Sequence, residues 1–332
     1  MLAKKTIFPH SLILMAALPV FLFCLGGKSP EWGLEEVLSI GTLNDTLIFQ
    51  WVGVVVDRDQ NIYVTDTMDY SLKKFDANGK LLKKTGRRGQ GPGEFAAPRY
   101  VSSYGNSIYV TDQYIPKIQV FDKDLNYISS IPVSIPVSDF SVLSENEIAV
   151  ATLSTTKAGI IYIFNSEGRI QNELPYSFKQ TPLMMEMVSF EFDQQRNLYL
   201  AYNFQDKIEK FDIEGKKLWS KKLLGIKKVK KEKIASLILP SKLIYKDIAL
   251  DKSGNLYVLG GSFSKNPSRD VYLLSPEGLH LATLTLPDTS HCIYIDSKDY
   301  LYSRANEGVT LKKFRLRLQE RGNISFLTSF NR

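Results

Sequence analysis

The stretch VVVDRDQNIYVTDTMDYSLKKFDANGKL, Val54 to Leu81, decides the fold because its pattern returns further along the chain. It reads as an apolar run, an aspartate, a few polar residues, an asparagine, an apolar–Tyr–apolar triplet, a loop, and an alternating segment that ends in Phe-Asp and a glycine. FEFDQQRNLYLAYNFQDKIEKFDIEGKKL (Phe190 to Leu218) repeats this pattern, and so does the segment that begins with IALDKSGNLYVLGG at Ile248. Self-similarity at a fixed period is the signature of a repeat architecture.

Three looser copies begin at Tyr100, Phe140 and Cys292, which brings the number of units to six. An apolar landmark residue in the third segment of each unit recurs about every 48 residues, within the length of one propeller blade. These landmarks are Phe75, Phe121, Phe164, Phe211, Leu274 and Phe314.

Each unit contains short runs that are apolar or alternate with period two, as in SLKKFDANG and KIEKFDIEG, and turn residues separate them. A unit of about four strands cannot bury both of its faces alone, but radially arranged units pack on one another. The sequence therefore predicts an all-β fold, a six-bladed β-propeller of four-stranded antiparallel blades over 36–332, with a linear solenoid as the alternative. The blades are expected to begin near residues 52, 99, 139, 188, 246 and 291. Either 35–43 or 323–330 could supply the strand that closes the ring.

The segment GQGPGEFAAPRYV…NSIYVTD…KIQVFDKD, Gly89 to Asp124, resembles the NHL-repeat propellers, and more closely the exported bacterial six-bladed β-propeller lipoproteins. The resemblance extends from about residue 36 to the end and is strongest over 54–124. It places the glycine-rich loop GRRGQGPGEF (86–95) between the outer strand of one blade and the inner strand of the next. A phosphate-binding loop would need Gly-Lys-Ser/Thr opening a helix, or a strand–glycine–helix unit with an acidic residue further on. Strand patterns flank this loop instead, so we expect a conformational role, with Gly91 in a glycine-only backbone region.

Residues 1–27 have the order of a secretory signal: Lys4 and Lys5, an apolar run from Leu12 to Leu25, and then Gly26-Gly27. Cleavage and export to the periplasm, cell envelope or exterior are expected, with an uncleaved anchor as the alternative. Cys24 lies where bacterial lipoproteins carry their lipidated cysteine, although large apolar residues precede it. Cys292 is the only other cysteine, so the mature chain can form no internal disulfide.

The formal charge of +7 falls to about +5 without the two lysines of the leader, which is too small an excess to imply nucleic acid. The lysine-rich insertion Lys221 to Lys242 could form a short amphipathic helix on an anionic membrane surface, or a solvated charged loop. RNA binding, known for some NHL propellers, would need stacking aromatics that this insertion lacks. We expect a monomer, and no nucleic-acid partner.

No catalytic or metal-binding set is recognisable in the sequence. His280 and His291 are too few for an imidazole-based zinc site, and no calcium-binding trio can be placed. The Asp-x-x-x-Asn pairs, such as Asp57 and Asn61, lack further acidic ligands and are expected to close turns. No cofactor is predicted.

The entries to the inner strands are predicted to ring one mouth of the central channel. Aligning the units on their second strands places polar side chains there, and this rim is the candidate ligand site. Its members are Trp51, Arg99, Tyr100, Asp139, Lys246, Asp247 and His291. Trp51 is expected to offer a flat apolar wall, and the charges to be exposed. The alternative is that a solvated rim is polar in any case.

These observations predict an exported, non-catalytic propeller that binds a protein, a glycan or a small ligand. The alternative is a metal-dependent hydrolase or lactonase with its site in the central channel. Stoichiometric metal in the purified protein would favour the enzyme.

Overall fold

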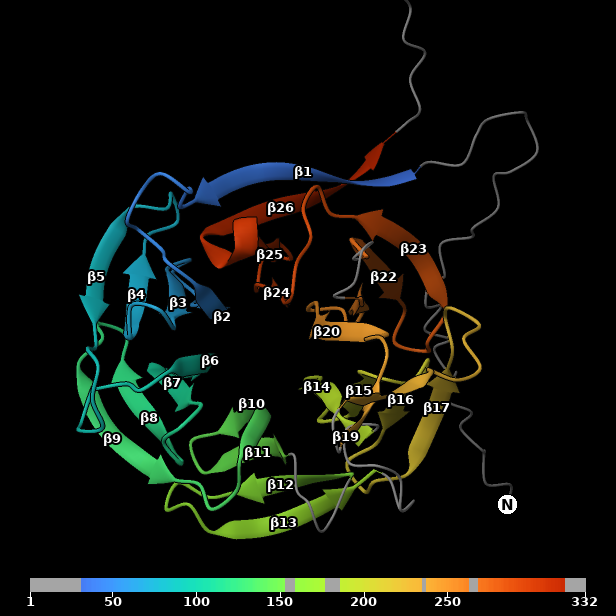
Figure 1. Ribbon diagram of the computed structural model, residues 1–332, viewed down its shortest axis with the longest axis horizontal. Coiled ribbons are helices and arrows are strands. Elements are labelled where there is room, and N and C mark those ends of the chain that lie inside the picture. The colour runs from blue at the N-terminus through green and yellow to red at the C-terminus, as the bar shows by residue number, and fades with distance from the viewer. Residues whose placement is uncertain (1–30, 153–158, 177–185, 235–236, 263–267, 320–332) are drawn as a thin grey trace, which may run out of the picture.

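Six four-stranded antiparallel sheets form a ring in the computed structural model, which describes residues 31–152, 159–176, 186–234, 237–262 and 268–319 (Figure 1). We call the sheets blades I to VI in the order of their inner strands. The predicted all-β class, the six blades and the four strands in each blade are confirmed.

One strand of each blade lies next to the central axis of the ring (Figure 1). These innermost strands are β2 (Trp51–Val56), β6 (Pro98–Tyr104), β10 (Val137–Ser144), β14 (Val188–Phe192), β20 (Tyr245–Leu250) and β24 (Ile293–Ile295). The second strands are β3 (Ile62–Asp66), β7 (Ser107–Asp112), β11 (Glu147–Thr152), β15 (Leu198–Tyr202), β21 (Leu256–Gly260) and β25 (Leu301–Ala305).

The third strands carry the landmark residues, all of which are buried. They are β4 (Ser71–Phe75), β8 (Lys117–Asp122), β12 (Ile160–Phe164), β16 (Ile208–Phe211), β22 (Asp270–Leu274) and β26 (Thr310–Gln319). The outermost strands are β5 (Leu81–Thr85), β9 (Tyr127–Pro132), β13 (Ile170–Pro175), β17 (Lys217–Lys221), β23 (His280–Thr285) and β1 (Glu31–Ile40). The 3-10 turn η2 (Asn306–Gly308) lies between β25 and β26.

The N-terminal strand closes the ring. β1 pairs antiparallel with β26 from Glu31 opposite Gln319 to Ile40 opposite Leu311, so the first strand of the described residues is the outermost strand of blade VI. Of the two candidate closing segments, 35–43 therefore overlaps the strand that closes the ring. The other candidate, 323–330, lies outside the described residues. The expected leader, 1–27 with Cys24, lies outside them too.

The core is divided among the junctions between blades. Six apolar clusters occur in the described part of the chain, and each joins two adjacent blades. At the junction of blades I and II, for example, Tyr63 and Leu72 pack with Ile108 and Phe121. Because each face is buried only against a neighbouring blade, the sheets stabilise one another around the ring.

Two kinds of aspartate organise the loops. Asp57 accepts hydrogen bonds from the backbone N–H and side chain of Asn61 and from the hydroxyl of Tyr63, which closes the turn between β2 and β3. Asp112 accepts four backbone N–H groups, including those of Ala96 and Ala97 in the link between blades I and II. The expectation that Asp57 and Asn61 close a turn is confirmed.

The glycine-rich loop 86–95 links β5 to β6 and is tied by its own groups. The N–H of Phe95 donates to the carbonyl of Arg87, and Glu94 accepts from Arg87 and from the N–H of Gly91. Gly86 has φ +101° and Gly93 φ +72°, whereas Gly91 is not among the positive-φ glycines. Glycines do supply left-handed backbone angles in this loop, but the choice of Gly91 was wrong because the positive-φ residues are Gly86 and Gly93. That the loop binds no phosphate stays a prediction.

The lysine-rich insertion forms a small hairpin of β18 (Lys231–Ile234) and β19 (Leu237–Pro240). The expected alternatives of a helix or a plain loop were therefore both wrong for 231–234 and 237–240. Inter-strand hydrogen bonds satisfy this backbone locally. Contact with an anionic surface stays a prediction. In the described residues, none of the helical structure is long and apolar enough to cross a bilayer.

Candidate functional site

The entry of an inner strand is bulged in four blades. The pairing register shifts between Trp51 and Gly53 in β2, and at the corresponding places in β6, β10 and β20. A bulge adds one unpaired residue and redirects the side chains next to it. The added residues are Val52, Arg99, Ser138 and Lys246. When the inner strands are superposed by register, Asp139 therefore occupies the position of Tyr100 and Asp247. The predicted alignment, which placed Asp139 at the position of Arg99 and Lys246, was wrong by one residue.

Asp139 joins blades III and IV. Its carboxylate accepts the N–H of Phe140 in its own strand, at 2.9 Å, and the N–H of Phe190 in the inner strand of blade IV, at 3.1 Å. Asp247 repeats this arrangement between blades V and VI, with the N–H groups of Ile248 and Ile293, both at 2.9 Å. Both aspartates are half-buried. The expectation of exposed rim charges was therefore wrong for these two residues, because each carboxylate is used inside the fold.

Glu191, which the sequence reasoning missed, is a third acid next to the axis. It lies in β14 and is half-buried. Burial, with the nearby charges of Asp139 and Asp247, raises its pKa to about 8. Burial raises the pKa of Asp139 to about 7, and burial with the charge of Asp139 raises the pKa of Asp247 well above its ordinary value. An acidic residue inside the apolar run FEF was the one sequence signal that could have indicated it.

Arg99 and Tyr100 face these acids from blade II. The Arg99 guanidinium lies 5.0 Å from the centre of the Tyr100 ring, a cation–π distance. Its Nε is buried without a hydrogen-bond partner. Burial raises the pKa of Tyr100 to about 12, so its hydroxyl stays protonated, and Arg99, Asp139 and Asp247 all act on it electrostatically. We call Arg99, Tyr100, Asp139, Glu191 and Asp247 the axial cluster.

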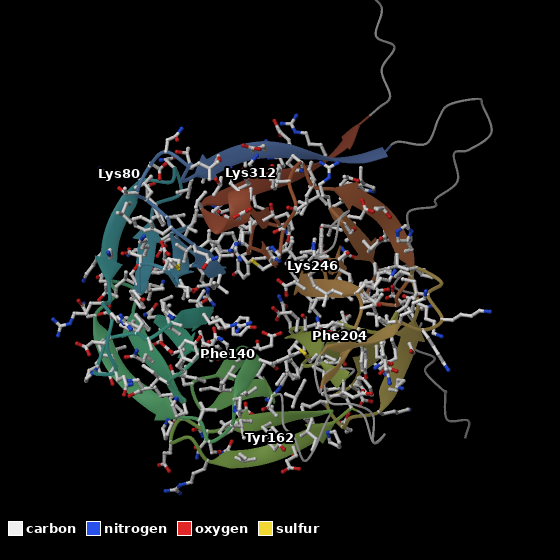
Figure 2. The ribbon with its side chains drawn as sticks, in the orientation of Figure 1. Lys80, Phe140, Tyr162, Phe204, Lys246 and Lys312 are labelled. Carbon is white, nitrogen blue, oxygen red and sulfur yellow. The ribbon has the colours of Figure 1, made fainter. Side chains whose placement is uncertain are left out.

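Lys246 is anchored next to this cluster. Its Nζ donates to the carbonyl of Ser290, at 2.9 Å, and to that of Ser268, at 3.2 Å, and only 8% of the residue is exposed. Burial lowers its pKa to about 8. Figure 2 shows Lys246 on the inner side of blade V, close to the axis. Lys246 thus connects blade V to the chain that leads into blade VI through its hydrogen bonds, and it also places an amino group near the axis.

His291 and Arg304 add a basic group on blade VI. His291 lies just before β24 and is partly exposed. Partial desolvation of its ring, with the charges of Arg304 and Lys246, lowers its pKa. The guanidinium of Arg304 donates to the carbonyl of Glu307 at 2.7 Å, while its Nε is buried without a partner. We call Lys246, His291 and Arg304 the basic rim. Arg304 was not expected from the sequence, because it lies in β25, and the predicted rim included only the entries to the inner strands.

Trp51 does not line this site. It is fully buried between blades VI and I, and its indole N–H donates to the carbonyl of Thr310 at 3.0 Å. The expected flat apolar wall was therefore wrong. The bulge at Val52 places Trp51 opposite Asp66, at the base of the strand, where a large ring fills the junction.

Neither a metal-binding set nor an activated thiol occurs at this site among the residues that the structure describes. Among the described residues, no group of three or more His, Cys, Asp or Glu side chains converges closely enough to hold a metal ion. Burial raises the pKa of Cys292 to about 12, which keeps its thiol protonated and weakly nucleophilic. The charged and hydroxyl groups of the axial cluster and the basic rim can form hydrogen bonds and ion pairs with a ligand.

The other end of the inner strands opens into a cavity of about 470 Å³ between the turns of blades IV, V and VI. Glu191 and Tyr294 line it where it meets the axis, and the charge of Glu191 contributes to the raised pKa of Tyr294. Glu191 therefore belongs both to the axial cluster and to the wall of this cavity.

The fold and these residues define a six-bladed β-propeller with a polar, partly buried group of ionisable side chains around its axis. The chain belongs to the DUF5128 family, described as 6-bladed beta-propeller, whose model matches residues 36–218. None of the curated proteins matches the sequence.

Solved structures share the fold at low identity. A member of the DUF4221 family from Bacteroides vulgatus is 13% identical with a TM-score of 0.60, over 88% of this chain and 100% of that one. Virginiamycin B lyase from Staphylococcus aureus is 12% identical with a TM-score of 0.53, over 86% and 99%. The WD40 repeats of RRP9 are 12% identical with a TM-score of 0.55, over 88% and 100%. At such identities, these likenesses show the fold alone.

Proposed function

We propose that this protein is a non-catalytic binding module whose ligand lies at the axis of the propeller, against the axial cluster and the basic rim. The observation that carries the proposal is the convergence of Arg99, Asp139, Glu191 and Asp247 from four successive blades. The raised pKa values of the three carboxyl groups mean that holding them ionised inside the fold costs folding free energy. Groups with pKa values perturbed in this way are concentrated at functional sites.

The charge distribution indicates the class of ligand. Three carboxyl groups lie around the axis with one guanidinium among them, while Lys246, His291 and Arg304 are grouped on the side of blades V and VI. Carboxyls that titrate near neutral pH can donate as well as accept hydrogen bonds, which suits hydroxyl groups. We infer a small polar ligand with hydroxyl groups and both charges, its cationic end toward the acids and its anionic end toward the basic rim.

Binding can be tested with a panel of amino sugars, uronic acids and amino acids, followed by thermal shift and calorimetry. We expect one class to bind, and Arg99→Ala and Glu191→Gln each to weaken binding at least about tenfold while the fold is retained. Lys216→Ala, an exposed lysine in a turn of blade IV, is the matched control and should bind as wild type. If the wild type and the three variants bound the ligand equally well, the ligand site would lie elsewhere.

The alternative of a metal-dependent hydrolase or lactonase finds no ligand set among the described residues, so we derive no metal step. Elemental analysis of the purified protein and a lactone hydrolysis assay would test this directly. Stoichiometric calcium or zinc that Asp139→Asn removes would overturn the non-catalytic proposal.

We also propose that the protein acts outside the cytoplasm, like the exported NHL-like propeller lipoproteins that its sequence resembles. Support comes from the order of charged, apolar and small residues over 1–27. Cell fractionation with N-terminal sequencing tests the proposal, and labelling with a palmitate analogue tests lipidation of Cys24. Folded cytosolic protein that retains Met1 would contradict export.

Contact between the lysine-rich insertion and an anionic surface is also a proposal. It can be tested by sedimentation with phosphatidylglycerol vesicles and with neutral vesicles. Binding to the anionic vesicles that falls as salt rises would support it, and equal binding to both would contradict it.

A further inference from the structure

The blade III–IV junction lacks a packing contact that three other junctions share. In the turn between a third and a fourth strand, a glycine with positive φ lies against the outer strand of the preceding blade. A Cβ on Gly79 would meet Ile40, one on Gly168 would meet Pro132, and one on Gly278 would meet Trp219 at about 3.1 Å. A Cβ on Gly215, the glycine of blade IV, would meet no described atom within 4 Å.

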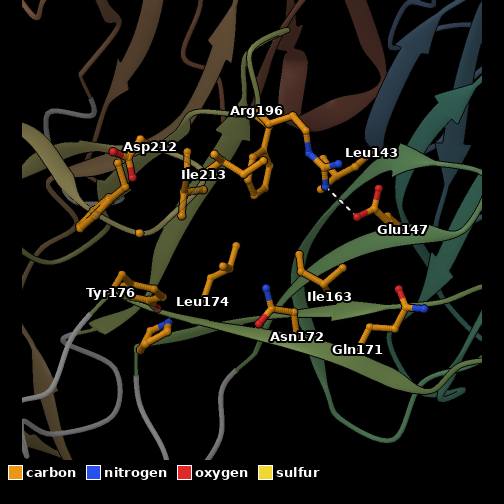
Figure 3. Close-up of a pocket in the computed structure, with 15 residues that line it drawn as sticks. Leu143, Glu147, Ile163, Gln171, Asn172, Leu174, Tyr176, Arg196, Asp212 and Ile213 are labelled. Atoms are coloured by element: carbon orange, nitrogen blue, oxygen red, sulfur yellow. Dashed lines mark hydrogen bonds and ion pairs between the residues drawn. The ribbon is translucent and has the colours of Figure 1, made fainter.

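An open cavity of about 100 Å³ occupies the place of the missing contact (Figure 3). Its apolar wall includes Ile163, Leu174, Phe192 and Phe211. Arg196 lies on one side, held by Glu147 at 2.8 Å. Because water can enter this open cavity, covering its apolar wall with a ring would remove apolar surface from water, which is favourable.

The next junction shows what fills the same place. Trp219 is paired with Lys210 and packs edge-on against Tyr199, with ring centres 6.0 Å apart. Its indole N–H donates to the carbonyl of Pro276 at 3.0 Å. In blade III, the residue in the register of Trp219 is Asn172, paired with Ile163, and Ala149 takes the place of Tyr199. Two aromatic side chains are thus replaced by small ones.

The hydrogen-bond acceptor of this arrangement is retained. The turns 212–215 and 275–278 are closed in the same way, by a bond from the glycine N–H to the carbonyl of the first residue. Ile213 therefore corresponds to Pro276, and it lines the cavity. Its carbonyl group corresponds to the group that accepts the Trp219 indole at the next junction.

We propose that the cavity between blades III and IV binds an aromatic ring with an N–H donor, the chemistry of an indole, in the way that Trp219 fills the next junction. The ring would lie between Ile163 and Ile213, with its N–H toward the carbonyl of Ile213. The Arg196 guanidinium complements the negative face of such a ring. This site is separate from the axial cluster, so either one can fail without the other.

The test uses 5-fluoroindole with the purified propeller, observed by fluorine NMR line broadening, because the fluorine signal reports on the ligand alone. We expect saturable binding to the wild type. Asn172→Trp rebuilds the packing of the next junction in this cavity, and should weaken binding at least about tenfold while it raises the melting temperature.

Two controls make the result specific. Ser129→Trp places the same ring at the corresponding position of blade II, where Pro132 already fills the junction, and should leave binding unchanged. Trp219→Ala opens the blade IV–V junction, and indole should raise its lowered melting temperature. This second variant shows whether a junction of this fold accepts the ring, even if Asn172→Trp folds poorly.

The source of the ring is decided by comparing 5-fluoroindole with the capped tripeptide Gly-Trp-Gly. Tighter binding of the tripeptide assigns the site to a tryptophan of a partner polypeptide, and tighter binding of free indole assigns it to a small aromatic molecule. The proposal is overturned if Asn172→Trp binds as wild type does. It is also overturned if indole stabilises Trp219→Ala and does not bind the wild type.

Discussion

Asp139 and Asp247 hold the same position on the inner strands of blades III and V, and each carboxylate connects its own blade to the next one. Each accepts one N–H from its own strand and one from the neighbouring inner strand. Since their charges also raise the pKa of Glu191, the same two side chains stabilise the ring and set the electrostatics of the candidate site.

Replacing Asp247 by Ala should lower the free energy of unfolding by about 1–3 kcal/mol, because the N–H groups of Ile248 and Ile293 lose their acceptor. Urea denaturation measures this. Lys216→Ala, which changes an exposed turn residue, should alter stability by less than about 0.5 kcal/mol. An Asp247→Ala protein as stable as wild type would show that water replaces the carboxylate without cost.

The stability of the wild type should fall as pH rises from about 4.5 to 8. Glu191 has a folded-state pKa of about 8, above its ordinary 4.5, so its contribution is complete below 4.5 and is lost as pH rises through the folded value. Glu191→Gln should remove part of this slope, and be more stable than wild type above pH 8 by on the order of 1 kcal/mol. The measurement is the melting temperature of both proteins from pH 4.5 to 8 in one buffer mixture. If the two melting temperatures changed with pH in the same way, the pKa of Glu191 would not be raised in the folded protein.

Gly86→Ala should destabilise the protein by about 1–3 kcal/mol, whereas Gly91→Ala should cost much less. Gly86 has φ +101°, and a Cβ there would lie 2.6 Å from the carbonyl oxygen of Tyr70. At Gly91 the nearest atom is the end of the flexible Glu94 side chain, at 3.0 Å. Thermal melts of the two variants provide the comparison, and equal losses would refute the assignment of strain to Gly86.

Deleting 31–40 should abolish cooperative unfolding or cause aggregation. Without β1, the edge of β26 is unpaired and the blade VI–I cluster loses Ile40 and Leu38. Circular dichroism and size-exclusion chromatography report the outcome, and a deletion of 1–30 is the control. A synthetic peptide of residues 31–40 should restore part of the stability. If the variant without residues 31–40 kept the full-length melting temperature, β1 would be dispensable.

The repeat made the fold predictable, because the pattern around Phe75 and its five counterparts records which residues each blade must bury. The site was less predictable, because alignment of the units ignores bulges. One extra residue at Ser138 shifted Asp139 by one position, and one at Val52 left Trp51 in the core. Glu191 was missed because a single acid in a buried strand carries no periodic signal.

The amino-acid sequence by itself determined the class, the number of blades and the turn chemistry, since alternation and Asp-x-x-x-Asn turns are local consequences of strand and hairpin geometry. Only the tertiary structure decided that β1 closes the ring, that the charges of Arg99, Asp139, Glu191 and Asp247 act on one another, and that a cavity lies beside Asn172. These features depend on contacts between residues distant in the chain, and such contacts are set by the packing of neighbouring blades, which no local pattern specifies.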